Sequence, residues 1–228
     1  MRFSRLIFLT AALLGIVTAA QAAEEKVFLN DGEAIKLYFF TPEPGAEPPR
    51  LAILISGGSN DEYMAEVQFW IGKEMVNRGW AIAVPIAPKG GDYFVEETGV
   101  FPKLIEFITS SHKLHPSKPL LFGVSQGGSA ALAIAAQNPT LYSGVIATPG
   151  RLSKKANFRD LDGLPVYLRI GEKDSFHWHK QLPDIVNTLY TAGANVDAGL
   201  VANGKHLFQL DWPDFDSWLE KLKQSNRQ

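Results

Sequence analysis

The sequence of 228 residues contains no cysteine. This absence excludes a disulfide framework, a cysteine nucleophile, thiolate zinc sites and cysteine-ligated iron–sulfur clusters. The sequence also lacks a large excess of positive or negative charge, because the formal net charge is only −2. The chain therefore has no overall positive field that would attract nucleic acid or anionic lipid. The lack of cysteine still permits an oxidising compartment, since a domain of this size can bury enough apolar surface without disulfides.

The composition is that of an ordinary globular protein. Hydrophobic residues make up 46% of the chain and charged residues 20%, which argues against disorder, collagen and coiled coil. With about 150 residues per domain as a guide, the length predicts one domain, or at most two small ones.

The first 22 residues have the three parts of a secretory signal peptide. Arg2 and Arg5 supply positive charge, residues 6–20 are apolar and uncharged, and an A-x-A cleavage pattern ends at Ala22. The apolar stretch is shorter than the ~20 residues that span a bilayer, so cleavage is favoured over a membrane anchor. We therefore expect a signal peptide at 1–22 and a single domain at 23–228, located in a bacterial periplasm or secreted.

Short apolar runs alternate with segments of helical periodicity along the rest of the chain. Strands are expected at residues 26–30, 35–40, 51–55, 80–85, 120–123, 143–147, 166–170 and 195–201, and helices at 66–78, 99–111, 127–137, 181–192 and 212–223. This order predicts an α/β fold in which helices cover both faces of a mostly parallel central sheet. Asp31-Gly32 favours a hairpin, which would add an antiparallel N-terminal edge. The alternation alone does not separate this fold from other doubly wound folds.

The clearest chemical motif is Gly-Val-Ser-Gln-Gly at residues 123–127, a G-x-S-x-G pattern. It follows an expected strand and opens an expected helix, which is the arrangement in which a sharp turn lifts the serine hydroxyl clear of a sheet. The helix N-terminus favours developing negative charge. Ser125 is therefore the candidate nucleophile, and a simple turn that caps a helix is the alternative.

A serine nucleophile needs a base, and the base needs an acid that orients it. Asp174 and His206 each follow an expected strand, which places both at the carboxyl edge of the sheet. His206 is the only histidine after the last expected strand, whereas Glu172 is the nearest rival of Asp174. We expect Asp174 to orient His206 and His206 to activate Ser125.

An oxyanion hole would complete such a site. One expected donor is the backbone N–H of Gln126, which follows the nucleophile. The other is the N–H of Gly58, because the pair Gly57-Gly58 follows a buried strand and lets the backbone approach a ligand closely. A plain glycine-rich turn is the alternative for this pair.

Three further groups of residues could have a functional role, but each also has a simpler structural explanation. Asp174, His177 and His179 could bind a metal, although a loop beside the active site is favoured, and we expect no metal and no cofactor. Phe176 and Trp178 could line an acyl pocket or pack in the core. The basic residues around Ser153, Arg151, Lys154 and Lys155, are expected to form a solvated face.

The segment GVSQGG at residues 123–128 resembles the G-x-S-Q-G-G motif of the phospholipase/carboxylesterase group in the α/β-hydrolase superfamily. The layout is also similar to that of dienelactone hydrolases, and the resemblance covers residues 26–223. It implies an α/β-hydrolase fold and the chain order Ser125, Asp174, His206 for the catalytic residues. These families usually carry His-Gly where this chain has Ser56-Gly57. Residues 148–164 leave room only for a minimal cap.

Together these features predict an exported serine hydrolase that cleaves carboxylic esters or thioesters of small molecules through an acyl-enzyme on Ser125. A prolyl-type peptidase-like hydrolase and a non-catalytic binding protein on a hydrolase fold are the alternatives, and the second would lack serine reactivity. No nucleic-acid partner and no stable membrane anchor are expected. The acyl and alcohol specificity and the oligomeric state are left open, because pocket shape decides them.

Overall fold

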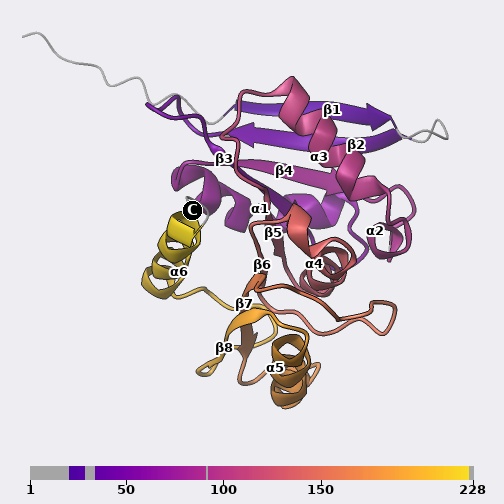
Figure 1. Cartoon of the computed structure of the whole chain (residues 1–228), viewed down its shortest axis with the longest axis vertical. Coiled ribbons are helices and arrows are strands. Elements are labelled where there is room, and N and C mark those ends of the chain that lie inside the picture. Colours follow the sequence, from indigo (N-terminus) through magenta and orange to yellow (C-terminus); the bar gives the residue numbers. More distant parts are fainter. Residues whose placement is uncertain (1–20, 29–33, 91, 226–228) are drawn as a thin grey trace, which may run out of the picture.

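The structure is a computed structural model that describes residues 21–28, 34–90 and 92–225 (Figure 1). Eight strands of this part form one sheet, which runs from β1 and β2 at one end of the molecule to β7 and β8 at the other. The strands are β1 (Gln21–Phe28), β2 (Ala34–Thr41), β3 (Arg50–Ile55), β4 (Trp80–Ile86), β5 (Leu120–Gly123), β6 (Gly144–Ala147), β7 (Pro165–Gly171) and β8 (Asn195–Val201). The helices are α1 (Glu62–Asn77), α2 (Tyr93–Glu96), α3 (Val100–Ser111), α4 (Gln126–Gln137), α5 (Leu182–Thr191) and α6 (Trp212–Ser225), with short 3-10 helices η1 (Pro139–Leu141) and η2 (Trp178–Gln181).

The strand order in the sheet is β1-β2-β4-β3-β5-β6-β7-β8. β2 runs antiparallel to both of its neighbours, β1 and β4, and the pairs from β4 through β8 are parallel. The predicted mostly parallel sheet with an antiparallel N-terminal edge is therefore confirmed.

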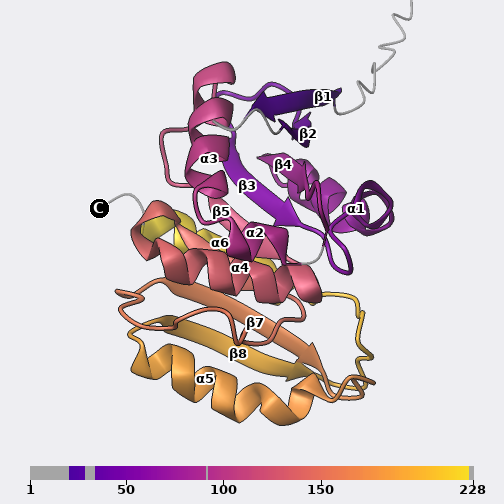
Figure 2. The ribbon, with the colours of Figure 1, turned by 90° about the vertical axis from the view of Figure 1, so that its right-hand side faces the viewer.

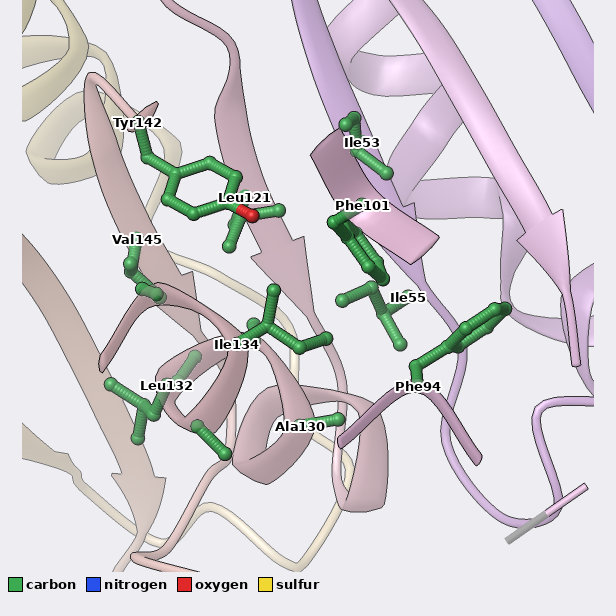
Figure 3. Close-up of a cluster of buried hydrophobic side chains, with 14 of the residues drawn as sticks. Ile53, Ile55, Phe94, Phe101, Leu121, Ala130, Leu132, Ile134, Tyr142 and Val145 are labelled. Carbon is green, nitrogen blue, oxygen red and sulfur yellow. The ribbon is translucent and has the colours of Figure 1, made fainter. Parts of the chain in front are cut away.

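Two buried clusters cover the two faces of the sheet, because alternate strand residues point to opposite sides. Ile53 and Ile55 join a cluster with α3, α4 and α5, whereas Ala52 and Leu54 join a cluster with α1 and α6. Figure 3 shows the first cluster, in which side chains of β3, β5 and β6 meet those of α2, α3 and α4. Figure 2 shows α5 lying along β8 at one edge of the molecule.

The N-terminal part differs from the expectation in two places. The strand expected at 26–30 begins earlier, at Gln21, so cleavage after Ala22 would remove the first two residues of β1. The rest of the predicted signal peptide and the turn at 31–32 lie outside the described residues. The helix expected at 66–78 begins instead at Glu62, because the side chain of Asp61 accepts the N–H of Met64 at 2.9 Å and caps it.

The cap region is small. Residues 148–164 connect β6 to β7 without a helix or strand along that stretch. Among the residues that the structure describes, no helix is both long and apolar enough to cross a membrane. Because β3, β5, β7 and β8 run parallel, the loops that follow them meet at one edge of the sheet, where ligands of such sheets bind.

Candidate active site

Ser125 lies at a sharp turn between β5 and α4. Its backbone has φ 56° and ψ −119°, a conformation that few residues other than glycine adopt. Gly127 permits this turn, because a Cβ at that position would lie only 2.1 Å from the carbonyl oxygen of Ile55. The turn leaves Ser125 partly exposed at the carboxyl edge of the sheet.

His206 comes from the loop after β8. Its Nε2 atom lies 2.7 Å from Oγ of Ser125, within hydrogen-bonding distance. When the ring proton is on Nδ1, the serine hydroxyl donates to Nε2. The imidazole is therefore in position to receive the hydroxyl proton.

Asp174 lies on the other side of the imidazole ring. Its Oδ1 atom is 3.1 Å from Nδ1 of His206 and also accepts the N–H of Phe176 at 2.7 Å. The carboxyl is buried, with a residue exposure of 1%. An acceptor at Nδ1 favours the tautomer in which Nε2 can accept the proton of Ser125. The structure thus brings together the three residues that the sequence analysis selected, from three separate loops.

Close backbone packing fixes the loop of Asp174 against the loop of His206. A Cβ on Gly171, at the end of β7, would lie 1.9 Å from the carbonyl oxygen of Lys205. The N–H of Lys173 donates to the carbonyl oxygen of Gly204 at 2.7 Å. Only glycine at position 171 allows this approach, so the distance between the carboxyl and the imidazole is set by the backbone.

The two expected oxyanion donors lie on segments close to Ser125. Gln126 is the first residue of α4, where N–H groups have no acceptor within the helix. A Cβ on Gly57 would lie 3.1 Å from Cβ of Ser125, so the loop after β3 packs on the nucleophile. The N–H of Gly57 donates to Oε1 of Gln68 at 2.6 Å, whereas the next residue, Gly58, is exposed at φ 63°.

Gln68 is a residue of the site that the sequence analysis missed. It is buried on the inner face of α1, with 5% exposure, among positions that are otherwise apolar. A buried polar side chain needs a partner, and Gln68 finds it in the loop of the predicted oxyanion hole. The available signal was a single polar residue on the buried stripe of an amphipathic helix.

Two aromatic rings pack against the imidazole of His206. The ring of Phe176 lies 4.5 Å from the imidazole centroid and that of Trp178 lies 5.0 Å from it, both in edge-to-face arrangements. Trp178 is buried at 6% exposure, whereas Phe176 is 64% exposed. The structure therefore places Trp178 in the core and Phe176 at the surface beside the predicted base.

A polar network holds the side chain of Gln126. Its Nε2 donates to Asp92 at 3.0 Å, and Nζ of Lys155 lies 2.8 Å from Asp92 and 2.6 Å from Glu96. The hydrogen bond from Lys155, and then that from Gln126, hold the pKa of Asp92 below its usual value. Lys155 is thus paired rather than merely solvated, and Asp92, in a loop with no recognisable motif, was missed.

The two histidines after Asp174 contact each other edge to face. The rings of His177 and His179 are 5.9 Å apart, and His177 is exposed in a left-handed backbone conformation. Within the described part of the chain, no three histidine, aspartate or glutamate residues are placed to hold a metal ion.

The fold of the chain is similar to the folds of several solved esterases and hydrolases. The structure is similar to a thermostable esterase, with a TM-score of 0.66 and 15% identity over 80% of this chain and 55% of that one. It is also similar to a "Putative Dienelactone Hydrolase" from Klebsiella pneumoniae subsp. pneumoniae, with a TM-score of 0.68 and 17% identity over 90% and 98% of the two chains. An esterase from the fungus Rhizomucor miehei gives a TM-score of 0.69 and 13% identity over 93% and 86%.

The chain thus spans about half the length of the thermostable esterase. At these identities the structural likeness establishes the α/β-hydrolase fold. None of the curated protein sequences matches the chain. The family model described as "Putative esterase" matches residues 88–227, which is more than half of the chain and includes Ser125, Asp174 and His206. The chain therefore belongs to this esterase family and has the α/β-hydrolase fold.

Proposed function

We propose that this protein is an exported serine hydrolase that cleaves carboxylic esters or thioesters of small molecules through an acyl-enzyme on Ser125. The observation that supports this most strongly is the line of hydrogen bonds from Ser125 Oγ to His206 Nε2 and from His206 Nδ1 to Asp174, at 2.7 and 3.1 Å. A serine and a histidine in contact, with a buried acid orienting the histidine, are what nucleophilic acyl transfer requires.

In the first half of the reaction, Oγ of Ser125 attacks the carbonyl carbon while Nε2 of His206 takes its proton. The carbonyl electron pair moves onto oxygen, and the N–H groups of Gln126 and Gly58 stabilise that charge. Asp174 stabilises the imidazolium that forms. When the carbonyl reforms, the bond to the leaving alcohol or thiol breaks and the leaving group takes the proton from His206.

In the second half, water replaces the alcohol. His206 removes a proton from the water as its oxygen attacks the acyl carbon, and the bond to Ser125 then breaks. The proton returns from His206 to Oγ, which regenerates the serine and releases a carboxylic acid. No step needs a redox partner or a group other than water and the chain's own residues.

The N-terminal sequence supports the proposed export. The charged start, the apolar stretch and the A-x-A pattern support cleavage after Ala22 and a mature domain at residues 23–228. Expression of the full chain in a bacterium, followed by N-terminal sequencing of the periplasmic protein, is expected to give a start at Ala23. Protein that stays in the cytoplasm with Met1 in place would contradict export.

A fluorophosphonate probe tests the proposed mechanism, because it labels a serine only when an assembled base activates it. We expect one stoichiometric adduct on the purified mature protein by intact mass, and none on Ser125→Ala or on heat-denatured protein. Ser175→Ala, which removes an exposed serine from the loop of Asp174, is the matched control and keeps the adduct.

Turnover of p-nitrophenyl esters is the second measurement. Ser125→Ala is expected to lower it by roughly 10⁴-fold or more. A folded wild-type protein that neither reacts with the probe nor turns over esters would overturn the serine hydrolase and would favour a binding protein on this fold. Cleavage of dipeptidyl amides in preference to esters would instead favour the peptidase.

A further inference from the structure

Arg151 is an exposed arginine that lies near the proposed active site without an acidic partner. The described residues place no carboxylate within 4.0 Å of its guanidinium, and the contact that the side chain makes is with the ring of Trp178. An unpaired guanidinium is a strong donor with five N–H groups in a flat fork. An ordinary surface ion pair therefore does not account for the position of the Arg151 side chain.

The backbone of Arg151 is fixed against the first turn of α4. Its N–H donates to Oγ of Ser129 at 3.0 Å, and Ser129 in turn donates its N–H to the carbonyl oxygen of Ser125 at 3.1 Å. A Cβ on Gly150 would lie 3.0 Å from the carbonyl carbon of Gly128, so the segment touches the helix directly. The base of the Arg151 side chain is thus held close to the nucleophile.

The guanidinium of Arg151 lies over the ring of Trp178, which itself packs against His206. The guanidinium carbon lies 5.2 Å from the centroid of the Trp178 ring, and that ring lies 5.0 Å from the centroid of the His206 ring. The exposed ring of Phe176 packs on the same imidazole at 4.5 Å. A cation–π contact of this kind holds an arginine in place while leaving its N–H groups available.

The acidic groups nearby form their direct ion pairs with another cation. Lys155 pairs with both Asp92 and Glu96, at 2.8 and 2.6 Å. The positive charge of Arg151 acts on Asp92 only over a longer distance, with less effect on the pKa of that carboxyl than Lys155 has. The guanidinium of Arg151 therefore lies outside the direct ion pairs of this cluster.

We propose that Arg151, held on the ring of Trp178, binds a carboxylate carried by the ester substrate, so that the protein prefers esters with an anionic branch. This inference rests on the proposed function, since it names the substrate class of that same site. A guanidinium fork binds a carboxylate through two parallel hydrogen bonds. The ring of Phe176 would cover the carbon chain between the carboxylate and the scissile bond.

The carboxylate can belong to the acyl part or to the leaving group, and two matched pairs of substrates separate these cases. The acyl pair is the p-nitrophenyl monoester of glutarate and its neutral terminal-amide analogue. The leaving-group pair is 4-acetoxybenzoate and 4-acetoxybenzamide. Each pair differs by one charge and hardly in shape, so a difference within a pair reports recognition of the anion.

The variants are Arg151→Gln, Arg151→Lys and, as a matched control, Lys154→Gln, which removes one exposed charge from the same segment. We expect the wild-type protein to prefer the anionic member of one pair. In Arg151→Gln, kcat/KM for that member falls roughly tenfold or more, mainly through a higher KM, because a charged hydrogen bond is lost. The neutral esters change less than twofold, Arg151→Lys is intermediate, and Lys154→Gln keeps the preference.

Binding provides a readout that does not depend on turnover. Calorimetric titration with glutarate is expected to show binding to the wild-type protein and to Lys154→Gln, and a loss of binding in Arg151→Gln. The inference is overturned if neither substrate pair shows a preference for the anion, or if the preference and the glutarate binding survive in Arg151→Gln. If ester turnover depends on Ser125 but not on the charge of the substrate, the anion site is excluded and the proposed function is still supported. Absence of the Ser125 adduct alongside Arg151-dependent glutarate binding would remove the hydrolase and keep the anion site.

Discussion

Ser125 is held in a backbone conformation that is costly for a residue with a side chain. Positive φ at a non-glycine residue costs on the order of 1–3 kcal/mol and persists only where the surroundings fix it. Here the N–H of Gly127 donates to Val124 at 2.9 Å and the N–H of Val124 donates to Ile55 at 3.2 Å. The turn is thus clamped by one hydrogen bond across itself and by one to the end of β3, which keeps the hydroxyl partly exposed and within hydrogen-bonding distance of His206.

Gly127→Ala tests that clamp. Its Cβ would lie 2.1 Å from the carbonyl oxygen of Ile55 and 2.4 Å from that of Ser56, and backbone atoms cannot move aside easily. We expect a loss of several kcal/mol of folding stability, or no folded protein, because overpacking alone costs about 1–3 kcal/mol. Gly99→Ala is the control, because nothing lies within 4 Å of its Cβ position and its φ is −80°. Equal melting temperatures for the two variants would show that the close approach is not required.

Asp174→Asn separates the orienting role of the acid from its role in folding. Asn keeps the shape and can still accept the N–H of Phe176, but it favours the wrong tautomer of His206. We expect kcat for ester hydrolysis to fall by roughly 10³- to 10⁴-fold with little change in melting temperature. Glu172→Gln, at the exposed rival acid that accepts the N–H of Asn203, is expected to change kcat less than threefold. The reverse ranking would assign the orienting role to Glu172.

At the scale of the elements, the sequence predicts best where the local signal is strong. The continuous apolar run of β5 gives the observed ends at 120–123. In β8 the apolar residues alternate with Asn195, Asp197 and Gly199, and the ends at 195–201 are also predicted correctly. The start of α1 is missed because its first two residues, Glu62 and Tyr63, are exposed and do not belong to the buried stripe, so only the cap at Asp61 marks it. The four-residue α2 is too short to show any periodicity.

For the proposed site, too, residues with a local sequence signal can be predicted and residues without one cannot. Ser125, Asp174 and His206 can be selected from the sequence because each follows a strand, and parallel strands end at one edge. The groups that surround them depend on contacts between distant loops. The pairing of Asp92 with Gln126 joins residues 34 positions apart, and no local pattern indicates it. Arg151 likewise acquires its contact with Trp178 only in the folded chain.

Asp214 of α6 accepts hydrogen bonds from two side chains of strand β7. The hydroxyl of the buried Tyr167 in β7 donates to Asp214 at 2.7 Å, and Arg169 of the same strand donates to it at 2.7 Å. These hydrogen bonds, that of Tyr167 first, hold the pKa of Asp214 below its usual value of 3.8, although partial burial acts in the opposite direction. The folded state therefore binds a proton at Asp214 less readily than the unfolded chain does.

A pH dependence follows from that difference. Because the folded pKa of Asp214 is depressed, its contribution to stability is present above about pH 4 and disappears as the pH falls through the folded value. We expect Asp214→Asn to lower the free energy of unfolding by about 1 kcal/mol at pH 7. This is less than a buried hydrogen bond to a charged group contributes, because Asp214 is partly exposed to solvent. The deficit should shrink toward zero in urea titrations at decreasing pH. Glu220→Gln, which affects only an exposed pair with Lys223, is the control. A deficit that is constant with pH would contradict the linkage.

At the scale of the whole molecule, the sheet joins every part of the site. The same strands supply both buried clusters, because β3 contributes Ile53 and Ile55 to one face and Ala52 and Leu54 to the other. The loops that carry Ser125, Asp174 and His206 extend from strands β5, β7 and β8 of that sheet. Loss of the sheet should therefore disassemble the proposed site and the core together.

This continuity predicts that the proposed mature protein, residues 23–228, unfolds as one cooperative unit. Scanning calorimetry at neutral pH is expected to show a single transition whose calorimetric and van't Hoff enthalpies agree. The reaction of Ser125 with a fluorophosphonate should be lost over the same temperature range as the far-ultraviolet circular dichroism, since the geometry of His206 and Asp174 depends on the strands that carry them. Two resolved transitions, or loss of labelling well below the melting of the sheet, would instead mean that β7, β8 and their loops open as a separate unit.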